Sequence, residues 1–209
     1  MDSTLVQSLM SSSTFSGKVR VMVFVDGGYL ESNIKKKWGD DVTVDYSLFR
    51  ESLIQHLPNR YAFDPYVIRI YYYDAVEEGI ILPPEQEAKH KLVNDTGYFE
   101  LRLGRLKKDG AGKPRQKGVD TLIAIDMVTK AYENHFDIAV LLAGDDDFLD
   151  VVKAVKNAGK QVFGFYFNHV TSEKLKNSFD QKQSIDTNFA TQIRTPQRPF
   201  KAGDAAGNK

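Results

Sequence analysis

The chain contains no cysteine, and its charges cancel, with 28 Lys and Arg residues against 28 Asp and Glu residues. The lack of cysteine excludes disulfide bonds, thiolate nucleophiles and zinc–thiolate sites. Balanced charge provides no overall field toward nucleic acids or membranes, so any such affinity must come from a local cluster. A chain without disulfides suits a reducing compartment, and we expect a cytoplasmic protein.

Long hydrophobic runs are missing as well. The longest runs are strand-sized, well below the ~20 residues that a membrane-spanning helix needs. The first residues lack the basic segment and continuous apolar stretch of a secretory signal, so we expect no membrane partner. A hydrophobic share of 42% in 209 residues nevertheless supports one α/β domain with a substantial core.

Composition divides the chain into three parts. Residues 1–17 are rich in Ser and Thr, and residues 195–209 combine Pro, Gly and scattered charges. Both ends are predicted to be flexible segments. The folded domain is predicted to span residues 18–194.

Strand-sized apolar segments alternate with helical ones in this domain. Strands are expected at residues 19–26, 66–73, 98–104, 137–143 and 160–167. Helices are expected at residues 45–56, 84–95, 120–134, 148–158 and 172–179, with a short helix or turn at 31–37. Such alternation predicts a three-layer, Rossmann-like α/β fold, with helices on both faces of a central, mainly parallel five-stranded sheet.

Acidic residues follow two of the expected strands. The run V-R-V-M-V-F-V-D ends at Asp26, and the run I-A-V-L-L-A-G-D-D-D-F carries Asp145, Asp146 and Asp147. Asp120 begins the helix after the third strand. The carboxyl ends of parallel strands share one edge of the sheet, where α/β proteins bind ligands. These carboxylates therefore meet if the first and fourth strands are neighbours.

Carboxylates held together repel one another, and a hard divalent cation relieves that repulsion. The pattern predicts a Mg²⁺ or Mn²⁺ site that acts on phosphates. The alternative is helix capping, which suits Asp120 and one of the three acids from 145 to 147, but explains Asp26 less well. Asp126 lies about 240° around the helix from Asp120, so it either supports the site or contacts solvent.

A second cluster is basic. Seven cations between positions 102 and 117 are opposed only by Asp109. We expect a glycine-containing loop that overhangs the acidic edge and binds the phosphate backbone of a nucleic acid. The alternative is a solvated loop with incidental charge, and Lys117 could instead contact the acidic site directly. The basic residues are Arg102, Arg105, Lys107, Lys108, Lys113, Arg115 and Lys117.

The aromatic residues and histidines give weaker signals. Tyr71, Tyr72 and Tyr73 could form a base-stacking platform, but neighbours on a strand face opposite sides, which favours the core. The same logic assigns the alternating Phe163, Phe165 and Phe167 to the core. The four histidines show no metal-ligand spacing and are expected at surface or boundary positions.

Three segments together resemble the NYN domain, a family of the PIN-like ribonuclease superfamily. They are F-V-D-G-G-Y-L at 24–30, K-G-V-D-x-x-x-x-x-D at 117–126 and L-L-A-G-D-D-D-F at 141–148. The resemblance covers residues from about 20 to 170. It implies a PIN-like fold in which the first and fourth strands are adjacent, and metal-dependent endonucleolytic cleavage of RNA.

By position, the resemblance assigns catalysis and binding of Mg²⁺ or Mn²⁺ to Asp26, Asp120, Asp145 and Asp147. It leaves Asp126 and Asp146 as candidate supporting residues. Ala143 stands where many members have Ser, and Tyr29 where many have Asn. These changes could alter metal or phosphate contacts, although they remove no carboxylate.

Two other functions stay open. The domain could hold RNA or protein partners without cutting, as the two departures would allow. A phosphatase of the haloacid dehalogenase type would need D-x-D after the first strand, and the sequence D-G-G argues against it. Compact domains of this size often pair, so a homo-oligomer is also considered, although no residue pattern specifies one.

Overall fold

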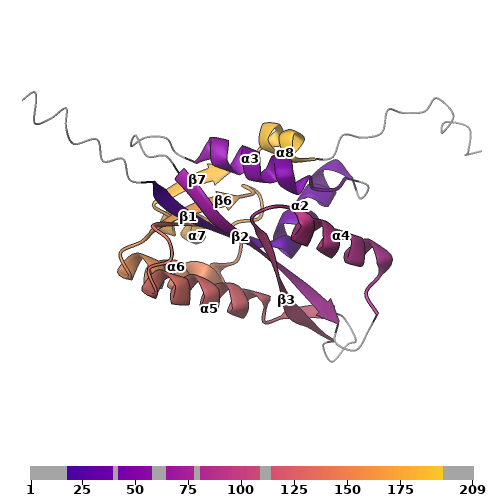
Figure 1. Ribbon diagram of the computed structural model, residues 1–209, viewed down its shortest axis with the longest axis horizontal. Helices are drawn as coiled ribbons and strands as arrows, with labels where there is room; N and C mark the ends of the chain where they lie inside the picture. Colours follow the sequence, from indigo (N-terminus) through magenta and orange to yellow (C-terminus); the bar gives the residue numbers. More distant parts are fainter. Residues whose placement is uncertain (1–17, 40–41, 58–64, 78–80, 109–113, 195–209) are drawn as a thin grey trace, which may run out of the picture.

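The computed structural model describes residues 18–39, 42–57, 65–77, 81–108 and 114–194 (Figure 1). Both predicted flexible ends lie outside these ranges. The strands are β1 (Val19–Asp26), β2 (Pro65–Glu77), β3 (Phe99–Lys108), β4 (Pro114–Lys117), β5 (Ile138–Leu142), β6 (Gln161–Tyr166) and β7 (Gln181–Ser184). The helices are α2 (Gly27–Trp38), α3 (Tyr46–His56), α4 (Pro84–Asp95), α5 (Val119–Tyr132), α6 (Leu149–Asn157), α7 (Glu173–Ser178) and α8 (Thr187–Ile193), with a short 3₁₀ turn, η1 (Asp146–Phe148).

The sheet has the order β4-β3-β2-β1-β5-β6-β7. Six strands are parallel and β4 is antiparallel to β3. This confirms the mainly parallel α/β fold and the adjacency of the first and fourth predicted strands, which are β1 and β5. The expected count of five was too low. It missed the two short edge strands: β4 lies in a segment that we expected to be a loop, and the sequence of β7, Q-K-Q-S, lacks an apolar pattern.

Helices cover both faces of the sheet (Figure 1). Leu30, Phe49 and Phe189, from α2, α3 and α8, pack in one core. Ile123 and Val152, from α5 and α6, pack in the other. Strand β1 is buried between these layers, which explains its almost continuous apolar sequence.

The tyrosines and phenylalanines assigned to the core are buried there. Tyr72 packs in one core, and Tyr71 and Tyr73 pack in the other, as the alternation of a strand requires. Phe163, Phe165 and Phe167 are buried as well. The surface or boundary position expected for His90 was wrong. Its Nε2 lies 2.7 Å from Asp74 Oδ2 inside the protein, and this polar contact makes burial tolerable.

The segment expected to be a basic loop forms a β-hairpin over its described residues. Arg105 pairs with Lys117 across β3 and β4. Gly104 serves close packing rather than loop movement, because a Cβ there would lie 2.6 Å from Val119 Cγ2 at the start of α5. Strand β3 of the hairpin therefore packs directly against the first residue of α5.

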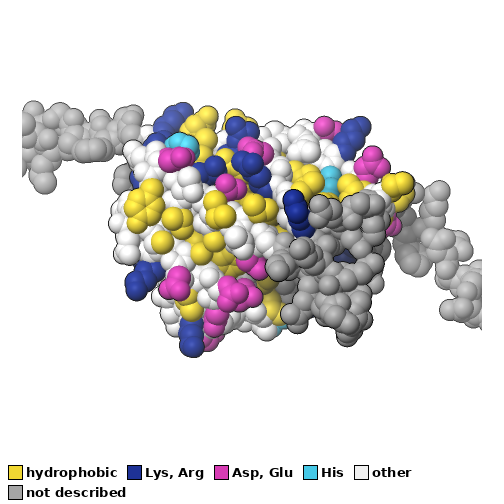
Figure 2. Space-filling model, turned by 90° about the horizontal axis from the view of Figure 1, so that it is seen from below, with side chains coloured by type: hydrophobic (Ala, Val, Ile, Leu, Met, Phe, Trp, Pro, Cys, Tyr) yellow, Lys and Arg dark blue, Asp and Glu magenta, His cyan; other side chains and the backbone are white. Residues whose placement is uncertain are grey.

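The face that carries α5 and α6 shows hydrophobic side chains across its middle, with charged groups around them (Figure 2). On α5, Ile125 and Tyr132 are 56% and 66% exposed. Two apolar side chains of this helix therefore face solvent, beside the exposed Thr121 and Thr129. Self-association remains an expectation. Among the described helices, none is both long and apolar enough to cross a bilayer.

Candidate active-site cleft

An open cleft of about 790 Å³ lies beyond the carboxyl ends of β1 and β5. We call it the acidic cleft. Its walls come from α2, the start of α5, the β5–η1 loop and the β6–α7 loop. The lining residues are Asp26, Tyr29, Ser32, Asn33, Lys36, Asp120, Gly144, Asp145, Asp146, His169, Val170, Thr171 and Ser172.

Asp26 connects β1 to α2. It is the N-cap of α2, and its Oδ1 accepts a hydrogen bond of 3.0 Å from the Tyr29 N–H. Gly27 lets the helix start close to the sheet, because a Cβ there would lie 2.5 Å from the Tyr72 ring. Burial raises the pKa of Asp26 to about 6; the Tyr29 hydrogen bond opposes this shift, and the charge of Asp120 adds to it.

Asp120 lies in the first turn of α5 and lines the same cleft. The N-cap of α5 is Gly118, at φ 93°, so Asp120 is not the cap, although its place in the first turn still suits the helix dipole. Its pKa is raised, first by burial and then by the negative charges of Asp145 and Asp147. The pKa shifts of Asp26 and Asp120 therefore place acids from three distant segments within electrostatic reach of one another.

The three consecutive aspartates have different surroundings. Asp145 is the N-cap of η1, and its Oδ1 accepts a 3.1 Å hydrogen bond from the Asp147 N–H. Asp146 lines the cleft and accepts a hydrogen bond from the Ser172 hydroxyl. Asp147 is exposed and does not line the cleft, but its charge acts on Asp120. The capping alternative thus applies to Asp26 and Asp145, which line the cleft nonetheless.

Tyr29 ties the walls of the cleft together. Its hydroxyl accepts a 2.8 Å hydrogen bond from the Phe167 N–H and shares a 2.5 Å hydrogen bond with the Thr171 hydroxyl. Its ring packs so closely on Gly144 that a Cβ there would lie 2.3 Å away. A tyrosine at this position therefore joins α2 to the β6–α7 loop and to the backbone beside Asp145.

We expect Tyr29→Phe to destabilise the protein by about 1–3 kcal/mol, because it leaves the buried Phe167 N–H without its acceptor. Urea unfolding followed by circular dichroism measures this change. Tyr132→Phe is the matched control, since that side chain is 66% exposed and should change stability little. Equal unfolding midpoints for wild type and Tyr29→Phe would contradict the role assigned to the hydroxyl.

Several cleft residues were not identified from the sequence. Ser32, Asn33 and Lys36 share a face of α2 with Tyr29, at the spacing i, i+3, i+4 and i+7. Asp26 as an N-cap could have revealed this stripe, because it starts the helix at Gly27 rather than near residue 31.

Asn33 is 3% exposed, and its buried Oδ1 has no hydrogen-bond partner in the described structure. His169 gave no signal; only the fold brings it to the cleft.

Asp126 does not line the cleft. Its Oδ2 accepts a 2.8 Å hydrogen bond from the Tyr73 hydroxyl, and Lys130 and Arg102 each lie 3.7 Å from its carboxylate. Asp126 therefore links α5 to the sheet, and any support for the cleft is indirect.

The predicted RNA-binding cations are only partly described. Arg102 forms an ion pair of 2.8 Å with Glu100, and its guanidinium lies 5.2 Å from the centre of the Tyr71 ring. Arg105 lies on β3, opposite Lys117 of β4. The backbones of Lys107, Lys108, Arg115 and Lys117 belong to the hairpin, but their side chains lie outside the described part, as does all of Lys113. RNA binding by this cluster stays a prediction.

The chemistry of the cleft suits a hard divalent cation. Its acidic groups offer only oxygen donors, and the raised pKa values of Asp26 and Asp120 reflect, after burial, a charge repulsion that a cation would relieve. Over the described ranges, no three His, Asp or Glu side chains already form a group that could hold a metal ion. The exposed Asp145 and Asp147 side chains would have to turn toward the bound cation.

Comparison with solved structures supports the fold. A protein of unknown function from Vibrio parahaemolyticus superposes with a TM-score of 0.65 and 20% identity, over 85% of this chain and 97% of that one. The nicotinamidase from Staphylococcus aureus reaches a TM-score of 0.35 and 12% identity, over 80% of this chain and 100% of that one, which is too low to bear on function.

Sequence comparison identifies the family. The uncharacterized protein y4oD of Sinorhizobium fredii is 35% identical over 75 residues, which are 36% of this chain and 33% of that protein. The match thus spans about a third of this curated relative. The sequence pattern of the NYN domain matches residues 20–186, most of the chain. The chain belongs to the NYN domain family, a nuclease family of the PIN-like superfamily.

Proposed function

We propose that this protein is an endoribonuclease that depends on Mg²⁺ or Mn²⁺ and hydrolyses RNA phosphodiester bonds in the acidic cleft. The observation that carries the proposal is the convergence of Asp26, Asp120 and Asp145, from β1, α5 and the β5–η1 loop, on one open cleft. Family membership supports the reaction class, and the oxygen donors support the metal.

Each acidic residue would have a defined task. Asp26, Asp120 and Asp145 would hold the cation. Asp147 would add a further negative charge near the site. A divalent cation in such a site lowers the pKa of a bound water and offsets charge on the phosphate. Asp26 is anionic above a pH of about 6, so metal binding and activity should fall below that pH.

Two other cleft residues, Tyr29 and Ser172, would hold the walls around these carboxylates in place. Tyr29 fixes the β6–α7 loop, and Ser172 donates a hydrogen bond to Asp146. Such positioning matters because catalytic groups must already lie close to their reacting geometry.

A binding module that does not cut RNA is the second candidate. It is favoured by the absence of a ready-made three-ligand metal group in the described residues, together with Tyr29 and Ala143, which stand where the family resemblance expects Asn and Ser. In that case the cleft would hold RNA without hydrolysing it.

Cleavage of end-labelled oligonucleotides separates the two candidates. We expect RNA fragments with Mg²⁺ or Mn²⁺, no fragments in excess chelator, and recovery of cleavage when metal is restored. A single-stranded DNA of the same sequence tests whether the substrate is restricted to RNA. Binding of intact RNA without fragments under every metal condition would establish the binding module instead.

A further inference from the structure

We propose that the bound RNA strand runs from the acidic cleft along α2, and that Lys36 holds a phosphate some distance from the cleaved bond. This inference rests on the proposed nuclease function and specifies how the substrate lies. It gives the strand a contact outside the β3–β4 hairpin, where the sequence alone places the basic cluster.

The geometry of α2 provides the track. Tyr29, Ser32, Asn33 and Lys36 lie on one stripe of this helix, and all four line the acidic cleft. The stripe therefore begins next to the carboxylates, at Asp26, and leads away from them. Its exposed polar groups are the Ser32 hydroxyl and the Lys36 ammonium, each of which can bind the backbone of a nucleic acid.

The charges explain why Lys36 matters. A cluster of aspartates repels a polyanion, so a strand that enters the cleft needs a neighbouring cation. Lys36 lines the same cleft as these acids, yet it forms no ion pair or hydrogen bond within the part of the chain that the structure describes. Its ammonium group is thus available for a phosphate.

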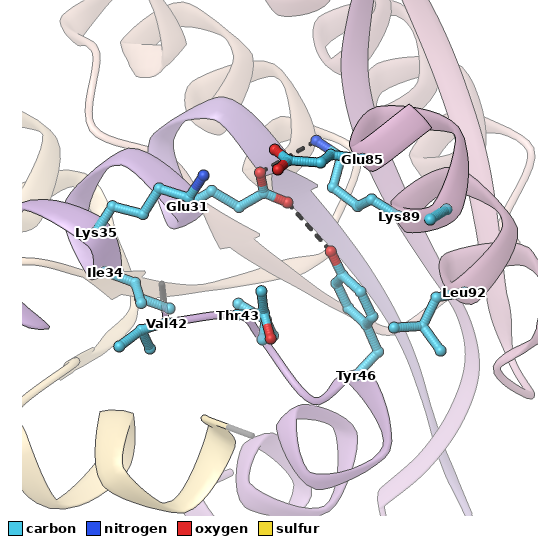
Figure 3. Close-up of a pocket in the computed structure, with 11 residues that line it drawn as sticks. Glu31, Ile34, Lys35, Val42, Thr43, Tyr46, Glu85, Lys89 and Leu92 are labelled. Atoms are coloured by element: carbon cyan, nitrogen blue, oxygen red, sulfur yellow. Dashed lines mark hydrogen bonds and ion pairs between the residues drawn. The ribbon is translucent and has the colours of Figure 1, made fainter. Parts of the chain in front are cut away.

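The neighbouring lysines lie elsewhere. Lys35 borders a separate cavity of about 430 Å³ between α2 and α4 (Figure 3). Helix geometry places this side of α2 opposite the stripe that lines the acidic cleft. In the separate cavity Glu31 accepts hydrogen bonds of 3.1 Å from both Tyr46 and Lys89. Lys37 lies over the ring of Trp38, 4.7 Å from its centre. Of the three consecutive lysines, only Lys36 lines the acidic cleft.

Distance along the helix defines the expected kinetic effect. Lys36 follows Gly27 by nine residues, which is about 14 Å at 1.5 Å per residue. Stacked nucleotides rise about 3.4 Å each along one strand, and the lysine side chain leans back toward the helix N-terminus, so this length corresponds to at most about four nucleotides. Lys36 should therefore act on substrate binding and KM, not on kcat.

The test compares Lys36→Ala with Lys35→Ala, which removes the same charge from the neighbouring position. Both are measured in the Asp26→Asn background, where we expect cleavage to be at least 100-fold slower. Fluorescence anisotropy with a labelled single-stranded RNA decamer reports the binding. We expect Lys36→Ala to weaken binding about three- to tenfold and to reduce the slope of log K against log salt by about 0.7. Lys35→Ala should change both quantities much less.

Substrate length provides a second measurement in proteins that retain Asp26. Lys36→Ala should raise KM for the decamer and leave kcat unchanged, whereas cleavage of a dinucleotide should not change. Equal binding losses for the two lysine variants, or equal effects on short and long substrates, would overturn the proposed track. Failure of the nuclease proposal would be separate, because it would appear as RNA that binds but is never cut.

Discussion

Asp26→Asn is expected to reduce RNA cleavage by more than 100-fold. Even partners outside the immediate ligand shell typically cost about 10–100-fold in metal affinity or activity, and Asp26 is assigned as a direct ligand. Asn keeps the helix cap, because its side-chain oxygen can accept the Tyr29 N–H hydrogen bond. The loss would therefore reflect missing charge rather than a broken helix start.

Steady-state cleavage of labelled RNA at saturating Mn²⁺ provides this measurement. Asp186→Asn is the matched control: Asp186 is the exposed N-cap of α8 and accepts a 2.9 Å hydrogen bond from the Phe189 N–H, outside the acidic cleft. It should cleave at the wild-type rate. Full activity in Asp26→Asn would remove this residue from the reaction.

The same substitution is expected to stabilise the metal-free protein above pH 6. The pKa of Asp26 rises from 3.8 to about 6 on folding, mainly because of burial. The native state thus binds more protons than the unfolded state between these values, so stability decreases as the pH rises through this window and stays low above it. The full pKa shift corresponds to a loss of about 2–3 kcal/mol in the free energy of unfolding. Asn carries no charge, so the Asp26→Asn protein should not suffer this loss.

Urea unfolding at pH 4 and pH 8, in chelator, checks the sign of this effect. Asp26→Asn should be more stable than wild type at pH 8, and the difference should nearly vanish at pH 4. Asp186→Asn should lack this pH dependence. A destabilised Asp26→Asn at pH 8 would mean that ionised Asp26 is favoured in the fold, contrary to the burial of its carboxylate.

The central features of the fold could be predicted because their signals are local. The apolar run of β1 and the helix at residues 84–95 depend on residue pattern and on a proline in the first helical turn. The first helix was predicted too short, since D-G-G weakens a helical pattern. The structure shows why the glycine is there: Gly27 packs against Tyr72, a contact made only in the folded chain.

The acidic part of the cleft could also be predicted, because topology places the ends of parallel strands at one edge. The walls formed by α2 and the β6–α7 loop could not be predicted from the sequence. Tyr29 meets Phe167 and Thr171 across about 140 positions of the chain, and no local pattern specifies such a contact. His169 and Ser172 reach the cleft for the same reason, through the path of the β6–α7 loop.

The most direct test of the account is the melting temperature of wild type and Asp26→Asn at pH 8, each with and without Mn²⁺. Binding to the native state alone stabilises a protein, by about 2.7 kcal/mol at 100 times the dissociation constant. If Asp26, Asp120 and Asp145 share one cation, Mn²⁺ should raise the melting temperature of wild type and have little effect on Asp26→Asn. An equal rise in both proteins, or none in wild type, would contradict the acidic cleft as a metal site.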